Sequence, residues 1–327
     1  MVDDLIGPDD ISAAADRLRG RVLRTPLVAL ADSGVLMKAE NLQSSGSFKI
    51  RGALNSLLQL EEDDARRGVV VHSSGNHAIA VAMAGAALGI PVTVVMPEDA
   101  PATKIRRTRA AGATVELVAP DSESRQRRAH ELAEPAALTL VEPYDNNAVL
   151  AATATIAVEI LEDLPDEEDA PATIYVAVSG GGLAGGVAAA AKLRGGATRV
   201  IGVEPEVAAD ALASWTAGRR VALPAAQMAS TMADGLRVQQ VGVRPWAHLE
   251  QYLDDIITVS EDQICAAMCS IASDACMVAE ASGAVSVAGA LSHGGPSAQG
   301  GRRPVAVLSG GNVDASVFAS VLTHTSE

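Results

Sequence analysis

Short runs of β-branched and apolar residues alternate with longer Ala-rich stretches along most of the chain. The runs typical of buried strands lie at 68–74, 91–97, 113–119, 137–143, 172–178, 198–205 and 303–311. Helical patterns stand between them and are clearest at 77–89, 123–133 and 148–164. Because strand, helix and strand follow one another repeatedly, the pattern predicts an α/β fold in which helices cover the faces of mostly parallel sheets.

Two polar breaks interrupt this pattern. The stretch 165–172 carries acidic residues and prolines, and 292–304 is rich in glycine, so both are expected to be solvated loops. With domains of ~150 residues each, a chain of this length suggests about two domains.

Composition narrows the classes of function. The chain is 48% hydrophobic and 20% charged, which is typical of a globular enzyme rather than a disordered protein. Aromatic residues make up only 2%, so few side chains could stack on the bases of a single-stranded nucleic acid. The formal net charge of −15 opposes binding to DNA or to an anionic membrane, although solubility or a salt-adapted host is enough to explain it.

The start of the chain gives no targeting signal. It is acidic and lacks the basic segment of a secretory leader. Since no apolar run approaches the ~18 residues of a membrane span, we expect a cytoplasmic protein without a membrane partner.

The most unusual lysine lies in SSGSFKIRGALNSL, residues 44–57. Lys49 follows Phe48 and stands among small, flexible residues instead of the charged neighbours of a surface helix. Such an amine suits covalent chemistry with a carbonyl group.

Two loops between a strand and a helix offer sites for anions. Ser73-Ser74-Gly75-Asn76 places hydroxyls, a carboxamide and the free N–H groups of a helix start together, which suits a carboxylate, although helix capping alone would explain one Ser or Asn. Ser179 followed by Gly180-Gly181-Gly182-Leu183 repeats the design for a phosphate, unless it is only a tight turn. Its consecutive glycines match neither a P-loop nor a good dinucleotide-binding turn.

A third polar group ends the last strand run. Ser309 is followed by Gly310-Gly311-Asn312, and open α/β folds bind ligands at such strand ends, although a simple turn is the alternative. Pyridoxal phosphate would use all of these features, because it needs an amine, donors for its phosphate and a partner for its ring nitrogen.

The motifs together resemble the fold type II pyridoxal-phosphate enzymes, and within them the serine/threonine dehydratase and serine racemase branch. SGSFKIRGA, SSGNHAIAVA, SGGGLAGG, GVEPEVAAD, TMADGL and LSGGNVD occur in the family's order over almost the whole chain. The resemblance implies two three-layer α/β domains: a large cofactor-binding domain of residues 1–61 and 147–327, and a small mobile domain of 62–146 that closes over substrate. It also implies a homodimer.

The resemblance further assigns a role to each matching residue. It makes Lys49 the catalytic Schiff-base lysine and Ser74 a proton donor on the opposite face of the cofactor. The cofactor would be bound by Phe48, Lys49, Asn76, Ser179, Gly180, Gly181, Gly182, Leu183 and Ser309. The substrate carboxylate would be gripped by Ser73, Ser74, Gly75, Asn76 and His77. Glu204, the carbonyl of Ala208 and Asp210 would bind Mg²⁺ or Ca²⁺, which prefer oxygen ligands.

The implied reaction is β-elimination on a β-hydroxy amino acid such as L-threonine or L-serine. A serine or aspartate-type racemase remains open, because proton transfer on two faces would also serve racemisation. Two departures from the family pattern, Ala151-Ala152-Thr153-Ala154-Thr155 and Glu280-Ala281-Ser282, leave room for 3-hydroxyaspartate or a hydroxyectoine breakdown product as substrate. A nucleotide-dependent oxidoreductase and a ligand-binding pseudoenzyme are the alternatives from other classes.

Overall fold

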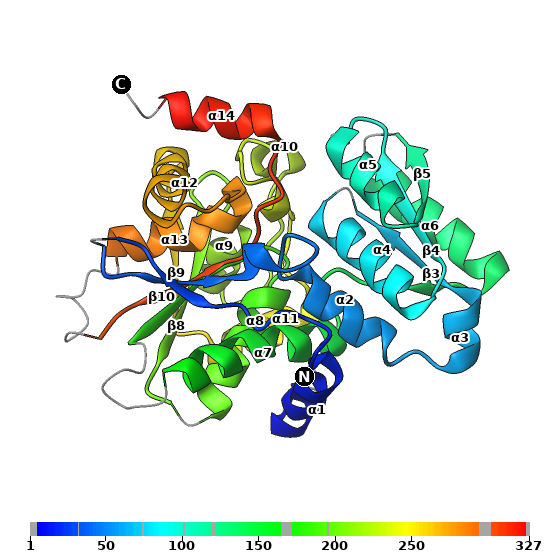
Figure 1. The fold of residues 1–327 in the computed structure, drawn as a ribbon, viewed down its shortest axis with the longest axis horizontal. Helices are drawn as coiled ribbons and strands as arrows, with labels where there is room; N and C mark the ends of the chain where they lie inside the picture. The colour runs from blue at the N-terminus through cyan, green and yellow to red at the C-terminus, as the bar shows by residue number, and fades with distance from the viewer. Residues whose placement is uncertain are drawn as a thin grey trace.

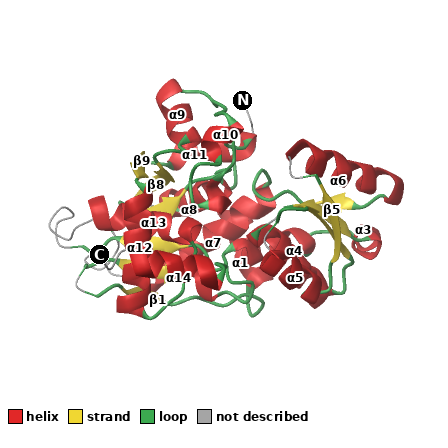
Figure 2. Ribbon diagram, turned by 90° about the horizontal axis from the view of Figure 1, so that it is seen from above, coloured by secondary structure: helices red, strands yellow, loops and turns green. Residues whose placement is uncertain are grey.

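The fold consists of two sheets, each covered by helices on its faces. The computed structural model describes residues 5–31, 33–73, 75–100, 102–119, 122–164, 172–194, 196–293 and 302–324. Two lobes stand side by side in perpendicular views, with β5 (Thr114–Val118) in one and β8 (Arg199–Pro205) and β9 (Asp255–Val259) in the other (Figures 1 and 2). The predicted α/β fold class is therefore confirmed.

The larger sheet joins the two ends of the chain. Its six strands run in the order β1-β2-β10-β7-β8-β9, where β1 is Leu27–Ala29, β2 Leu36–Ala39, β7 Thr173–Ala177, β8 Arg199–Pro205, β9 Asp255–Val259 and β10 Val305–Leu308. Only β1 is antiparallel to its neighbour, and β10 lies between β2 and β7. This order places the end of β10 beside the segment that follows β2.

The smaller sheet is wholly parallel. Its four strands run in the order β5-β4-β3-β6, where β3 is Val69–His72, β4 Val92–Pro97, β5 Thr114–Val118 and β6 Thr139–Leu140. All four fall within the stretch 62–146.

Helices fill the space between and around the strands. They are α1 Pro8–Leu18, α2 Lys49–Leu57, α3 Glu62–Arg67, α4 Asn76–Leu88, α5 Ala102–Ala110, α6 Ser122–Ala136, α7 Asn147–Asp163, α8 Gly182–Leu193, α9 Asp210–Ala217, α10 Ala225–Met228, α11 Val243–Tyr252, α12 Glu261–Ala275, α13 Ala281–His293 and α14 Ala315–His324, with short 3₁₀ helices η1 Glu40–Leu42 and η2 Asp234–Leu236.

Alternation along β7 shows how the large sheet is covered on both faces. Ile174 and Val176 belong to the core cluster formed with α7, α8 and α11, whereas Tyr175 and Ala177 belong to the cluster formed with α12 and α13. Successive side chains of a strand point to opposite faces, so a strand buried on both sides is apolar throughout.

Helix α2 connects the two sheets. Its buried residues Ile50, Ala53, Leu54 and Leu57 join the core of the smaller sheet and α4, and they also reach Ala152 of α7. Figure 1 shows α2, the helix that begins at Lys49, between the two lobes. Among the described helices, none combines the length and the hydropathy needed to cross a membrane.

Candidate active site

Backbone pairing with the end of β10 positions Lys49. Ser47 forms an isolated antiparallel bridge with Gly310, and the Phe48 N–H donates to the carbonyl of Ser309 at 3.0 Å. Gly46 makes the preceding turn with φ +77°, a conformation that favours glycine. Lys49 and Ser309, which lie far apart in the sequence, therefore meet at one edge of the sheet.

The amine of Lys49 is held by the backbone. Its Nζ donates to the carbonyl oxygen of Pro143 at 2.8 Å and lies 5.1 Å from the centroid of the Phe48 ring. The side chain is partly buried, and desolvation lowers the pKa of Lys49 to about 8. A lowered pKa leaves more of the amine neutral, which is the form that attacks a carbonyl and accepts a proton.

The loop after β3 enters α4 beside this lysine. Ser73 ends the strand, Gly75 precedes the helix and Asn76 begins it, while Ser74 lies outside the described residues. His77 is buried, with its Nε2 3.1 Å from the carbonyl oxygen of Val141. Burial and the charge of Lys49 lower the pKa of His77 to about 3, so the ring is neutral. His77 therefore ties α4 to the segment after β6, and its contact with substrate stays a prediction.

Asn76 is hydrogen-bonded on both sides of its amide. Its Nδ2 donates to Glu280, and its Oδ1 accepts from Asn312 Nδ2 at 2.8 Å. Glu280 is buried, and desolvation together with the charge of Asp234 raises the pKa of Glu280 to about 7.

The glycine loop opens α8. Gly181 has φ +87°, and a side chain there would meet Pro245 at 2.7 Å. Gly180 and Gly182 are packed by Tyr144, whose ring would lie 2.4 Å from a Cβ on Gly180. Glycine is thus required for turn geometry and for close packing. The N–H groups at the start of α8, including that of Leu183, have no partner inside the helix. Ser179 Oγ donates to the carbonyl of Gly235 at 3.0 Å.

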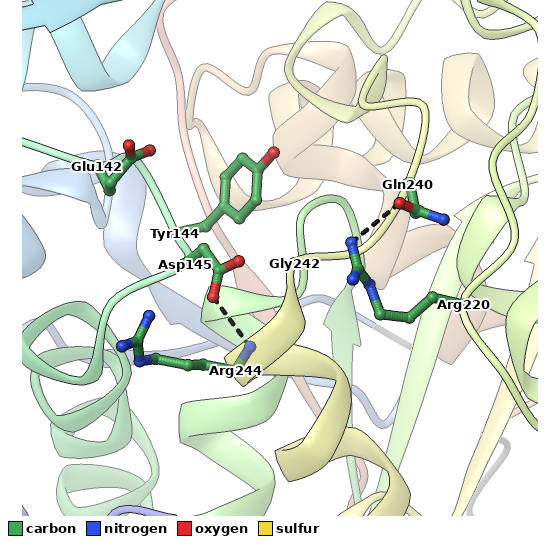
Figure 3. A pocket seen from close by; sticks show the side chains of 7 residues that line it. All are labelled: Glu142, Tyr144, Asp145, Arg220, Gln240, Gly242 and Arg244. Carbon is green, nitrogen blue, oxygen red and sulfur yellow. Dashed lines mark hydrogen bonds between the residues drawn. The ribbon is translucent and has the colours of Figure 1, made fainter. Parts of the chain in front are cut away.

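A polar pocket of about 450 Å³ adjoins this loop (Figure 3). Tyr144 lines it together with Glu142, Asp145, Arg220, Gln240, Gly242 and Arg244. The N–H of Gly242 donates to the carbonyl of Gly180 at 3.1 Å, so the pocket is continuous with the outer side of the loop. Its lining does not include Lys49.

Ser309 directly follows β10 and is buried. Its Oγ lies 3.5 Å from the carbonyl of Ser282, which leaves the hydroxyl weakly held. The next residue in the chain is Gly310, where a Cβ would lie 2.1 Å from Glu280 Oε1 and 3.2 Å from Asn76 Nδ2. Ser309, Glu280 and Asn76 therefore belong to one cluster.

The residues predicted to bind a metal lie at the end of β8, in the turn that follows it and at the start of α9. Glu204 is buried, and its two oxygens accept from the N–H groups of Ala211 at 3.1 Å and Leu212 at 2.8 Å. Both carboxylate oxygens of Asp210 are buried without a hydrogen-bond partner among the described residues. Desolvation raises the pKa of Asp210 to about 7, and desolvation with the charge of Asp210 raises the pKa of Glu204.

This donor set fits a hard cation. Ala208 is buried in the turn that joins these carboxylates, so its carbonyl is available from the same turn. The described residues contain no cluster of three or more His, Cys, Asp or Glu side chains that could form a different metal site.

The departure at 151–155 lies within α7. Thr153 is fully buried, and its Oγ1 donates to the carbonyl of Gly182 at 2.7 Å. A Cβ on Gly186 of α8 would lie 2.2 Å from that Oγ1. The side chain of Thr153 is therefore accommodated where α7 crosses α8, and it contacts the glycine loop through the carbonyl of Gly182.

Several residues of the site were not assigned from the sequence. The carbonyl of Pro143, the carboxylate of Glu280 and the amide of Asn312 hold Lys49 and Asn76. The departure from the family pattern at Glu280-Ala281-Ser282 drew attention to Glu280 in the sequence. Its hydrogen-bond partner, Asn76, lies 204 residues away and could not be inferred from that stretch.

Comparison with known proteins places this site in a family. The family described as "Pyridoxal-phosphate dependent enzyme" matches residues 18–310. L-threonine ammonia-lyase of Thermotoga maritima is 38% identical over 97% of this chain and 78% of that protein. L-threo-3-hydroxyaspartate ammonia-lyase of a Pseudomonas species is 37% identical over 96% of this chain and 97% of that protein.

Solved structures agree with this match. Maize serine racemase superposes with a TM-score of 0.90 and 33% identity, and the alignment covers 99% of each chain. The predicted two-sheet fold and the predicted family branch are thus confirmed. The interpretation of the glycine loop as a dinucleotide-binding turn is not supported.

Proposed function

The chain belongs to the pyridoxal-phosphate dependent enzymes, and we propose that it is a lyase that removes the β-hydroxyl group of a small β-hydroxy amino acid. L-Threonine and L-serine are the substrates we expect first. The Cα–H and Cβ–O bonds break, water leaves, and hydrolysis of the enamine product returns that water and gives a 2-oxo acid and ammonia.

The residues fit the cofactor. Lys49 offers a partly buried amine with a pKa of about 8, and the start of α8 offers N–H groups and the positive end of a helix dipole to the phosphate. When bound, pyridoxal phosphate supplies an electron sink for the negative charge that develops at Cα.

Lys49 performs two tasks in this proposal. Its neutral amine would hold the cofactor covalently, and the amine freed by the incoming substrate would take the proton from Cα. The carbonyl of Pro143 keeps the free amine directed at one point, because it accepts a hydrogen bond from Nζ. The ring of Phe48 excludes water from one side.

The other groups bind and orient. The glycine loop Gly180-Gly181-Gly182 with Leu183 and Ser179 takes the phosphate, Ser309 donates to or accepts from the ring nitrogen, and Asn76 donates to the phenolic oxygen. The loop Ser73-Ser74-Gly75-Asn76 takes the substrate carboxylate. Ser309 is an alcohol, so it cannot hold the ring nitrogen protonated as a carboxylate would, and this favours prompt elimination.

Further parts of the proposal concern the surroundings of the site. We propose that residues 62–146 form the small domain that closes over substrate, and that 1–61 with 147–327 form the large domain. Glu204, the carbonyl of Ala208 and Asp210 are proposed to bind Mg²⁺ or Ca²⁺. A cytoplasmic homodimer completes the proposal.

The observation that carries this function is the meeting of the Lys49 amine with the Ser309 strand end and the start of α4. The test incubates the purified, cofactor-loaded enzyme with L-threonine, L-serine and L-threo-3-hydroxyaspartate and measures 2-oxo acid and ammonia. Equal amounts of both products are expected, and Lys49→Ala should form neither. If none of these substrates releases ammonia from an enzyme with bound cofactor, the proposed elimination is wrong.

Racemisation is the second candidate, because a serine racemase shares the fold over nearly the whole chain. Chiral analysis of the residual serine in the same assay separates the two activities. A D-serine yield that exceeds the pyruvate yield would make the racemase the main function.

A further inference from the structure

A chain of side-chain hydrogen bonds runs across the site from Arg107 to Glu280. The guanidinium of Arg107 on α5 donates to Asn312 Oδ1, and Asn312 Nδ2 donates to Asn76 Oδ1 at 2.8 Å. Asn76 Nδ2 then donates to Glu280 Oε1. Every link joins the stretch 62–146 to the rest of the chain.

The two ends of this chain fix its direction. A guanidinium only donates hydrogen bonds and an ionised carboxylate only accepts them, so the amide oxygen of Asn312 must face Arg107 and the amide nitrogen of Asn76 must face Glu280. The amide of Asn312 also donates to the carbonyl of Ser45 at 2.9 Å, which holds it in the same orientation. Neither amide can flip without losing a bond at each side.

Two glycines make room for the chain. A Cβ on Gly46 would lie 2.2 Å from Asn312 Oδ1, and a Cβ on Gly310 would lie 2.1 Å from Glu280 Oε1 and 3.2 Å from Asn76 Nδ2. Gly310 directly follows Ser309 in the chain, so the bond between Asn76 and Glu280 packs against the residue after the one proposed for the ring nitrogen. Glu280 and Asn312 are both buried, which strengthens a charge-assisted bond.

We propose that Glu280 is a positioning residue that directs the second N–H of Asn76 toward the phenolic oxygen of the cofactor. It does so as the last acceptor in the chain of hydrogen bonds that begins at Arg107, and this chain is complete only when the two domains are together. This inference rests on the proposed function. Asn76 has two amide hydrogens, and Glu280 takes one of them. The other remains for the cofactor, and its direction depends on Glu280 staying an acceptor.

The surroundings of Glu280 link this role to pH. Asp234 of η2 raises the pKa of Glu280 and Lys104 and Arg107 of α5 lower it, as does the bond from Asn76, and burial is the largest cause of the net rise to about 7. A protonated Glu280 can donate as well as accept, so the direction of the chain is no longer imposed below that pH.

The first experiment compares Glu280→Gln with the wild type, both loaded with pyridoxal phosphate. The readout is the visible absorption of the bound cofactor, which reports whether the phenolic oxygen accepts a hydrogen bond. We expect the long-wavelength band to lose intensity to a shorter-wavelength band in the variant. We also expect kcat to fall about tenfold, because a charge-assisted hydrogen bond is stronger than a neutral one by roughly the free energy that corresponds to a tenfold change in rate. The wild-type spectrum should change through an ionisation near pH 7, and the variant should be flat there.

A double-mutant cycle tests whether Glu280 acts through Asn76. Glu280→Gln in the Asn76→Ala background should add no further spectral change and no further loss of kcat, because the group that it positions is already gone. Asp254→Asn is the matched control: this carboxylate accepts from the N–H of Val200 and from Lys192, away from the site. The control should lose some stability and keep the wild-type spectrum.

Two outcomes separate the inference from the proposed function. A wild-type protein that binds no pyridoxal phosphate would overturn both. If the wild type binds cofactor and is active while Glu280→Gln keeps its spectrum, its pH response and its rate, the function stands and the positioning role is wrong. Glu280→Ala, which has no acceptor for Asn76, should show at least the spectral change and loss of rate of Glu280→Gln, and a wild-type spectrum in this variant would equally contradict the positioning role.

Discussion

At the scale of single residues, the reactivity of the site follows from what surrounds each group. Lys49 has its pKa lowered by burial, and Glu280 has its pKa raised by burial and by Asp234. The amine is thus more often neutral than a surface lysine, and the carboxylate titrates in the physiological range. Both changes bring the pKa values of these two groups closer to neutral pH, which suits acid–base chemistry.

The identity of residue 309 offers a test of the proposed electron sink. Ser309→Asp should slow elimination, because a carboxylate would hold the ring nitrogen protonated, strengthen the sink and favour transamination over loss of the hydroxyl. Initial rates of 2-oxo acid release measure this, and cofactor converted to its amine form measures the competing reaction. Ser309→Ala serves as the control for lost packing, and equal elimination by Ser309→Asp and the wild type would contradict the argument.

Hydrogen bonds between residues far apart in the sequence could not be predicted from the sequence alone. Lys49 and Ser309 were predicted because each stands in a distinctive local motif. Glu280 and Asn312 bond Asn76 across 204 and 236 residues, and no local pattern encodes a contact of that range. Their roles became visible only in the folded chain.

At the scale of elements, α2 is anchored by a buried ionic cluster on the side away from the amine. Arg51 is fully buried and donates to Glu40 of η1 and to Glu159 and Thr155 of α7. Lys38 of β2 reaches Glu159 at 2.7 Å, so two cations and two carboxylates neutralise one another. This cluster fixes the helix that carries Lys49.

Arg51→Met should therefore be strongly destabilising. Removing the guanidinium leaves Glu40 and part of Glu159 buried without their main cation, and such losses cost about 3–5 kcal/mol. Urea denaturation of the wild type and the variant gives the difference in the free energy of unfolding. Arg24→Gln is the control, because Arg24 pairs with Glu162 and Asp163 with half of its side chain exposed, and such pairs contribute at most about 1 kcal/mol. Similar losses in both variants would contradict the anchoring role.

Strands that form continuous runs of apolar, β-branched residues were predictable from the sequence, and strands without such a run were not. The runs at 68–74, 91–97 and 172–178 became β3, β4 and β7, because β-branched residues buried on both faces give an unmistakable signal. The run at 137–143 gave only the two-residue strand β6. Strands β1, β2 and β9 were not predicted: β1 and β9 are the partly exposed edge strands of the larger sheet, and β2 is interrupted by Lys38, so their own patterns are weak.

At the scale of the whole molecule, polar contacts bring the two sheets together at the site. Besides the chain from Arg107, Thr103 donates to Asp314 and Lys104 pairs with Asp234, so one face of α5 contacts the larger sheet's side. Polar contacts separate at less cost than an apolar interface because water can replace them. The polar contacts of α5 are therefore the ones that a movement of residues 62–146 would separate most readily, whereas the apolar packing of α2 on the smaller sheet would resist separation.

The metal proposal predicts an effect on the stability of the whole fold. Among the described residues, neither carboxylate oxygen of Asp210 makes a hydrogen bond of good geometry, and the N–H groups of Asp210 itself and Val241 offset only part of its burial. A poorly compensated buried group of this kind, beside the buried carboxylate of Glu204, costs about 1–3 kcal/mol. A cation that binds only the folded state repays this cost, by about 2.7 kcal/mol at a hundred times its dissociation constant. We therefore expect Mg²⁺ or Ca²⁺ to raise the free energy of unfolding of the wild type, measured in urea with and without chelator.

Asp210→Asn distinguishes this linkage from a general effect of salt. The amide removes a buried charge, so the variant should be more stable than the wild type in chelator. It should respond less to added cation, because the substitution removes one of the only two negative charges of the proposed donor set. Asp254→Asn, at a carboxylate already paired with Lys192, should respond to the cation as the wild type does. A wild type and an Asp210→Asn variant that gain equally from the cation would place the binding elsewhere, and the two buried carboxylates would then be satisfied by protons alone, as the raised pKa values of both residues permit.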